Sequence, residues 1–329
     1  MRYLSQRVKE ETCPVIEVLF DTLSGLETHL VTHWSFNGFN VTNANSVILD
    51  FSLIDDLSGN VKVIKNLLET LFKNGVNAIP AVQENSPANY IAMVKGLTIS
   101  YGCKICIRTS ATSGGFLNYN VSINALTTGL GITPGNTILL IDLGYAEAHN
   151  YNLLAALAQS IIGGIPHINH WNQIVIASGS FPDNLSLLPV QAHPQYLHRY
   201  EWDIWLAIAS LVSQHTNIKY SDFGTKHPFF SDVSFPGSCS LKYASVNKYV
   251  IYRGELAGSH IHGNGQFITH AQKLIRTADY SGHAFSWGDL RISEIAAQNV
   301  ADPNKKPGSL ETWVQISQNH HITLLHSLL

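Results

Sequence analysis

The sequence predicts an α/β protein of the (β/α)8, TIM-like barrel class with a C-terminal helical extension. Three observations predict it: short β-branched and apolar runs recur, helical stretches separate them, and most runs end at a polar residue. Eight strand–helix alternations over roughly 250 residues are what such a barrel requires. A doubly wound open sheet is the main rival, because it shows the same alternation.

The clearest strand is expected at residues 136–144, Asn-Thr-Ile-Leu-Leu-Ile-Asp-Leu-Gly. Its apolar residues run without the polar alternation of a half-buried strand, so we expect both faces to be covered. Asp142 stands where this run ends. A lone carboxylate is costly to bury, so Asp142 is expected to face a polar cleft or a partner.

Four strands with a helix behind each are expected before this one. They span residues 14–18, 46–51, 78–84 and 104–110, and end near Glu17, Asp50, Glu84 and Arg108. The stretch 60–74 carries apolar residues at helical spacing, and Gly75 follows it as a common helix stop. Pro87 opens the next helix, because proline is tolerated in a first turn.

Three more strands are expected after it, ending at Ser178, Asp222 and about Tyr243. The sixth spans 173–180 and the seventh 218–224. The eighth is either 240–245 or the neighbouring run 248–254. Because Val246-Asn247 between these runs is a candidate tight turn, the pair is also a candidate hairpin.

The expected domain organisation is a barrel over 1–254 and an extension over 255–329 that packs on it. A glycine-rich stretch opens the extension, and helical stretches follow at 266–277, 290–299 and 313–329. Asp289 or Ser286 is the expected cap of the second of these helices.

Composition excludes several classes of protein. The chain has 329 residues, 45% apolar and only 13% charged, so it can bury a large core and is not disordered. A net charge of −3 gives no global attraction to nucleic acid. We expect a cytoplasmic protein without membrane segments, because the first residues are too polar for a signal peptide and no apolar run approaches ~18 residues. Four cysteines fit a reducing compartment, and Cys103 and Cys106 are interpreted as core residues.

The polar strand ends are expected to ring one mouth of the barrel, where enzymes of this fold build their active sites. The set is Glu17, Asp50, Glu84, Arg108, Asp142, Ser178 and Asp222. Crowded carboxylates repel one another unless a cation lies among them. Either Asp50, Glu84 and Asp142 hold a divalent cation such as Mg²⁺, or Arg108 is an internal counterion while two carboxylates act as acid and base.

These alternatives make Asp50, Glu84, Arg108 and Asp142 the catalytic candidates. Ligand-binding candidates are Glu17, Ser178, Asp222, Tyr243 and Arg253. Arg253 precedes the glycine-rich stretch, and many barrels bind phosphate at the loops after strands seven and eight. The competing interpretation is that these polar groups cap helices or form structural ion pairs, and that the glycines are hinges. The sixteen histidines include no H-E-x-x-H motif, and the chain has no G-x-S-x-G elbow.

Several different short motifs follow one another along the chain in a fixed order. They are Pro14-Val-Ile-Glu17, Val47-Ile-Leu-Asp50, Asp142-Leu-Gly, Tyr220-Ser-Asp-Phe-Gly, His227-Pro228, Tyr252-Arg-Gly254, Phe285-Ser-Trp-Gly-Asp289 and Asn319-His320-His321. This order resembles the bacteriophage "beta protein" family. The resemblance implies a setting of phage–host conflict, with anti-phage defence as the expected role, and it implies no catalytic residues. One departure is Leu19-Phe20-Asp21, where basic residues are expected after the first strand.

Three functions remain open. The first is a hydrolase or lyase acting on a phosphorylated or nucleotide-like ligand gripped by Arg108 and Arg253. The second is a binding component of a defence system, with a small ligand or a protein partner, and a homo-oligomer is compatible with it. The third is a phage structural or accessory protein. Carboxylates that converge around an ion would favour the enzyme, and carboxylates that are individually paired would favour the binder.

Overall fold

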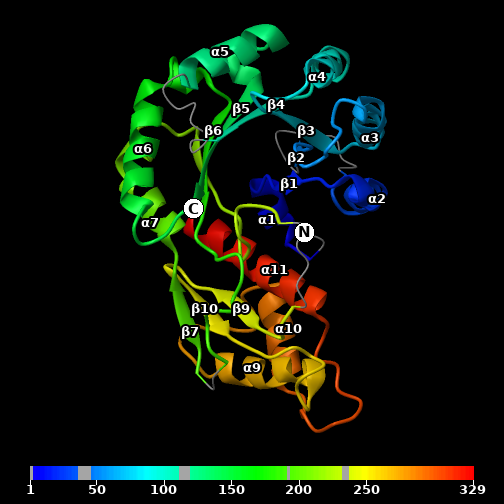
Figure 1. Ribbon diagram of the computed structural model, residues 1–329, viewed down its shortest axis with the longest axis vertical. Helices are drawn as coiled ribbons and strands as arrows, with labels where there is room; N and C mark the ends of the chain where they lie inside the picture. Colours follow the sequence, from blue (N-terminus) through cyan, green and yellow to red (C-terminus); the bar gives the residue numbers. More distant parts are fainter. Residues whose placement is uncertain (1–2, 36–45, 111–118, 191–192, 232–236) are drawn as a thin grey trace.

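Seven parallel strands form the main sheet of the computed structural model, which describes residues 3–35, 46–110, 119–190, 193–231 and 237–329 (Figure 1). Each strand pairs in parallel with its neighbour in the order β1-β2-β3-β4-β5-β6-β8. The strands are β1 (Val15–Glu17), β2 (Ser46–Asp50), β3 (Asn77–Val82), β4 (Ile105–Ser110), β5 (Thr137–Tyr145), β6 (Gln173–Gly179) and β8 (Ile218–Ser221). The seven strands that the sequence predicts before residue 225 are therefore confirmed.

Helices cover the outer face of this sheet in an arc (Figure 1). They are α2 (Leu23–His33), α3 (Val61–Lys73), α4 (Ala88–Tyr101), α5 (Tyr119–Leu130), α6 (Tyr151–Gly164), α7 (Tyr200–Ala207) and α8 (Ala209–Val212). Short 3-10 turns occur at Phe20–Thr22, Pro134–Asn136, Ile168–His170 and Gly263–Gly265. The apolar runs of the strands are uninterrupted for the predicted reason, because one face of the sheet meets helices and the other face of the sheet points inward.

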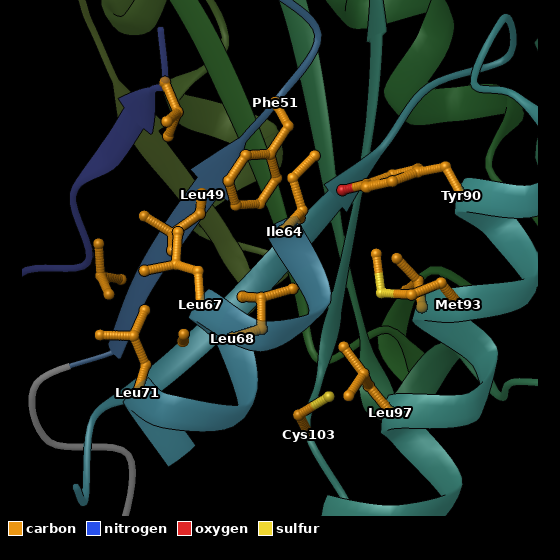
Figure 2. Packing of buried hydrophobic residues seen from close by; sticks show 14 of the residues in the cluster. Leu49, Phe51, Ile64, Leu67, Leu68, Leu71, Tyr90, Met93, Leu97 and Cys103 are labelled. Carbon is orange, nitrogen blue, oxygen red and sulfur yellow. The ribbon is translucent and has the colours of Figure 1, made fainter. Parts of the chain in front are cut away.

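Two large hydrophobic clusters fill the space between the helices and the sheet. Figure 2 shows part of the first, where Leu67 and Leu68 of α3 lie near Leu49 of β2 and Phe51. A smaller cluster lies on the concave face of the sheet. Its members are Ile48, Ile79, Ala81, Cys106, Ile138, Leu140, Val175 and Ala177. Both faces of the central strands are therefore buried.

The sheet does not close into an eight-stranded barrel, and the predicted eighth parallel strand is wrong. Residues Leu241–Ala244 (β9) and Lys248–Tyr252 (β10) form an antiparallel hairpin, which confirms that alternative. Together with β7 (Gln195–His198) they build a separate sheet in the order β7-β10-β9. A two-residue turn lets the two strands satisfy each other locally, whereas a parallel eighth strand would need a long crossover connection.

The remaining helices pack on this second sheet and on the open side of the first. They are α1 (Gln6–Glu11), α9 (Gln266–Leu274), α10 (Trp287–Ala296) and α11 (Leu310–Leu328). One hydrophobic cluster runs from Cys239 to Ile316, so the hairpin shares its core with helices on the far side of the expected boundary at residue 254. In the described part of the chain, no helix is both long and apolar enough to cross a membrane.

Candidate functional site

The guanidinium of Arg108 gathers three carboxylates that come from three other strands. Its Nη1 donates to Glu17 Oε1 and to Asp50 Oδ2, both at 2.7 Å. Its Nη2 donates to Asp142 Oδ2 at 2.6 Å. The Arg108 side chain is 13% exposed, Glu17 28%, Asp142 11% and Asp50 1%. The predicted meeting of these strand ends at one edge of the sheet is thus observed for four of the residues.

Local turns fix the orientation of the two buried aspartates. Asp142 Oδ1 accepts the N–H of Gly144 at 2.9 Å, and Asp50 Oδ1 accepts the N–H of Ser52 at 2.9 Å. Gly144 has a φ of +72°, a conformation that side chains rarely tolerate. Each aspartate therefore uses one oxygen to accept a backbone N–H two residues further on, for Asp142 at a register shift near the end of β5, and aims the other at Arg108.

The electrostatics of this cluster favour the internal-counterion alternative. Burial lowers the pKa of Arg108, but Asp142, Asp50 and Glu17 together raise it well above its ordinary value. One guanidinium among three carboxylates leaves a formal charge of −2. Because Nε, Nη1 and Nη2 all donate to these carboxylates, Arg108 has little capacity left to grip an anionic ligand.

The geometry gives no support to a metal held by Asp50, Glu84 and Asp142. Glu84 lies just past β3, is exposed, and accepts from Thr109 Oγ1 at 3.4 Å instead of joining the Arg108 cluster. Among the described residues, no three His, Cys, Asp or Glu side chains are grouped so that they could hold a metal ion.

A second buried network surrounds Arg199, which the sequence did not single out. Arg199 Nε donates to Glu201 Oε1 at 2.7 Å, and its Nη2 donates to Asp222 Oδ2 at 3.1 Å. Asp222 also contacts His321 Nε2 of α11 through both oxygens, at 2.8 and 2.9 Å. Tyr249 of β10 donates to Glu201 Oε1 at 2.8 Å. This network ties the end of β8 to the hairpin and to α11.

Asp222 repeats the local geometry of Asp142. Its Oδ1 accepts the N–H of Gly224 at 2.9 Å, and Gly224 has a φ of +63°. Burial raises the pKa of the Asp222 carboxyl, but His321 and Arg199 hold it well below its usual range. The shared Asp-x-Gly pattern was visible in the sequence. His321 was visible only as part of a motif, because its contact with Asp222 joins residues 99 positions apart.

Both networks reach one cavity of about 1120 Å³ on the open side of the main sheet. Ile48, Leu140 and Val175 of the concave face line it, opposite Ile322 and Leu325 of α11. Its charged and polar lining includes Glu17, Arg108, Lys219, Asp222, Lys226, His227, His321 and His326. Asp50, Glu84 and Asp142 are not part of this lining. The cavity exists because α11, and not an eighth strand, faces the gap between β1 and β8.

Three predicted ligand-binding residues lie outside the cavity lining. Ser178 donates to Gly144 O at 3.3 Å within the sheet. Tyr243 of β9 donates to Asp289 Oδ1 at 2.7 Å, and Asp289 Oδ2 lies 2.8 Å from His320 Nδ1. Arg253 Nη1 contacts Ser238, Ser240 and the Gly254 carbonyl. Tyr243 lies in β9 of the second sheet, and Arg253 directly follows β10 of the same sheet.

The cysteines behave as core residues, as the sequence indicates. Cys103 and Cys106 are buried, and all four cysteines are free thiols. Burial raises the pKa of Cys103 to about 11 and that of Cys13 to about 12, so these thiols are not reactive near neutral pH.

Comparison with known families shows which family this chain belongs to. A family model described as Beta protein matches residues 1–326. The chain belongs to the Beta protein family. The resemblance drawn from the short motifs is therefore confirmed, and it covers nearly the whole of this Beta protein family member. No curated protein matches it.

Solved structures similar to this Beta protein family member share little sequence with it. Two structures of malate synthase from Haloferax volcanii, one native at 3 mM glyoxylate and one a lead(II) complex, have TM-scores of 0.39 at 9% and 10% identity. The alignments cover 68% and 66% of this chain and 65% and 62% of the synthase, less than two thirds of its length. The 3-dehydroquinate dehydratase of Aquifex aeolicus VF5 has a TM-score of 0.32 at 12% identity, covering 66% of this chain and 94% of that one. Likenesses this distant carry no argument about function.

Proposed function

We propose that this Beta protein family member binds a small phosphorylated or nucleotide-like ligand in the cavity between the main sheet and α11. The observation that carries the proposal is a cavity of about 1120 Å³ reached by two buried charged networks. Ligand sites in proteins are typically concave, mostly apolar, and furnished with a few fixed polar groups. The apolar concave face and the fixed side chains of Glu17 and His321 match that description.

The charges along the cavity support a ligand with two unlike ends. At the β1 edge, Glu17 belongs to a cluster with a formal charge of −2, which suits hydroxyl or amino donors. At the β8 edge, the lining carries Lys219, Lys226 and His227, which suit an anionic group. A phosphorylated ligand with a ribose or base has both kinds of group, and Arg108 orients Glu17 without contacting the anion.

Hydrolysis of that ligand is the second candidate, because three carboxylates do converge. They converge on Arg108 and not on an open position, and Asp50 and Asp142 do not line the cavity. Binding is therefore favoured over catalysis. With a substrate identified, Asp142→Asn tests the alternative: unchanged turnover removes Asp142 from the mechanism.

The cellular setting we propose is the cytoplasm of a host cell in conflict with phage. What supports the setting is the phage–host conflict that the family resemblance implies, and what supports the compartment is four free thiols that fit a reducing environment. The alternative is that the protein acts in a defence system by binding a protein partner. Phage plating efficiency on cells carrying the wild type, compared with cells carrying an empty vector, tests the setting. Equal plating across a diverse phage panel would exclude it.

The direct test of binding uses calorimetry with nucleotides, sugar phosphates and the matching nucleosides. We expect Glu17→Gln to lower the affinity for the compound that binds roughly 10-fold, because a charged acceptor for its hydroxyl or amino donors is lost. Glu10→Gln is the matched control, since Glu10 is exposed on α1 and lies outside the cavity lining. Equal affinity of the two variants would place the ligand elsewhere, and no binding by any compound would defeat the proposal.

A further inference from the structure

His321 is the most buried titratable side chain in the lining of the cavity, and its bonding is incomplete. Its side chain is 1% exposed. Nε2 contacts both oxygens of Asp222, while Nδ1 has no hydrogen-bond partner among the described residues. Nδ1 is itself buried, and buried polar nitrogens are nearly always paired, so an unpaired one on a residue that lines the cavity is a candidate for a group that a ligand completes.

Charge balance around His321 decides which kind of group is missing. Arg199, Glu201 and Asp222 are buried together, and one guanidinium facing two carboxylates leaves a formal charge of −1. A net buried charge is costly unless a counter-charge lies beside it. An imidazolium at His321 supplies that counter-charge against Asp222, whose two oxygens lie 2.8 and 2.9 Å from Nε2. In this form both ring nitrogens are donors, so Nδ1–H lacks an acceptor.

We propose that His321 is an imidazolium that forms an anion-binding subsite of the cavity, held by Asp222 through Nε2 and donating from Nδ1 to a phosphate or carboxylate oxygen of the ligand. This inference rests on the proposed function and names the residue that recognises the anionic end of the ligand. Lys219 and Lys226 line the same cavity and add positive charge to it. Asp222 and Arg199 are positioning residues, since they act through His321.

The test uses the full chain with inorganic phosphate and acetate as probes at constant ionic strength and neutral pH. His321→Gln keeps an amide N–H able to reach Asp222 but loses the charge and the second donor. His149→Gln is the matched control, because His149 is exposed, pairs with Glu147 and lies outside the cavity lining. Nitrogen-15 spectra of the wild type report whether the His321 ring carries two protons.

We expect a doubly protonated His321 ring, a shift of its Nδ1 signal on adding the anion, and about 10-fold or greater weakening in His321→Gln, with His149→Gln unchanged. Preference for phosphate over acetate, or the reverse, identifies the anionic group. A neutral His321 ring overturns the inference, and so does equal anion affinity in His321→Gln and the wild type. If adenosine binds but neither anion does, the inference fails while the cavity keeps its ligand. If His321→Gln does not fold, the wild-type spectra decide.

Discussion

At the residue scale, one arginine determines what the acidic strand ends can do. Arg108 is buried among Glu17, Asp50 and Asp142, so their charges stabilise the fold first and are available to a ligand only through Glu17. The Asp-x-Gly turns at Asp142 and Asp222 show how the sequence prepares such a cluster. The glycine permits a tight turn, the turn binds one oxygen, and the other oxygen is free to meet an arginine.

Arg108→Met is expected to lower the free energy of unfolding by about 3–5 kcal/mol, because it leaves buried carboxylates without a counterion. The raised pKa of Arg108 sets the pH dependence. Because the pKa of Arg108 is higher in the folded than in the unfolded state, its contribution to stability is fully present below the unfolded pKa. The loss of unfolding free energy in Arg108→Met should therefore stay constant between pH 6 and 10. Urea unfolding across that range measures it.

The matched control is Arg291→Met, whose partner Glu294 is three residues away on an exposed helix face. Its cost is expected to be below about 0.5 kcal/mol, as for exposed helical pairs. Comparable losses in the two variants would show that the Arg108 cluster is not a buried counterion site.

Four of the predicted site residues could be placed together from sequence alone, because parallel strands align their carboxyl ends. Arg199 and His321 could not. Arg199 contributes through a connection between β6 and β8, and His321 comes from a helix near the C-terminus. No periodicity relates these positions to Asp222. The placement of Tyr243 and Arg253 at the mouth followed from the predicted eighth strand, and the structure puts both residues outside the cavity lining.

At the element scale, α11 takes the position that a closing strand would hold. One face meets the second sheet, where Trp313 and Ile316 join the hydrophobic core and Ser317 donates to Lys242 O at 2.7 Å, and another face lines the cavity. A capping box of Ser309 and Thr312 fixes its start. Close approach to α10 is possible because Gly288 has no side chain: a Cβ there would lie 2.5 Å from Ile316 O.

Gly288→Ala is therefore expected to destabilise the protein by about 1–3 kcal/mol, the range found for overpacked sites. Gly96→Ala is the matched control, because Gly96 is an exposed glycine of α4 with open space at its Cβ. This change should stabilise by about 0.5–1 kcal/mol, since alanine is the better helix former. Thermal unfolding of both variants measures the contrast, and a stabilising effect of Gly288→Ala would refute close packing of α10 on α11.

At the scale of the whole molecule, two sheets are joined through buried charge. Arg199 donates to the Ser245 and Val246 carbonyls of the hairpin turn and to Asp222 at the end of the main sheet. The cavity lies beside this junction, lined by the open side of the main sheet and by α11. Its shape therefore depends on how the second sheet and its helices are held.

Arg199→Met should loosen the second sheet and α11 more than the main sheet. Native-state hydrogen exchange is expected to show the opening free energy of amides in β9, β10 and α11 falling by about 3–5 kcal/mol, with a smaller fall in β4 and β5. Arg276→Met, at an exposed position after α9, serves as the control and should change neither. An equal fall in both sheets would mean that the molecule opens only as one unit.

The sequence by itself determined the strand–helix alternation, seven of the strands and the gathering of acidic groups at their ends. It could do so because a strand that is buried on both faces has an uninterrupted apolar sequence, and because parallel strands align their carboxyl ends. Only the tertiary structure decided that the eighth segment folds back as a hairpin and that α11 faces the gap. It also decided that Asp222 meets Arg199 and His321. These outcomes depend on a competition between pairing of neighbouring segments and packing of segments that are far apart in the sequence. No local sequence pattern indicates which arrangement is more stable.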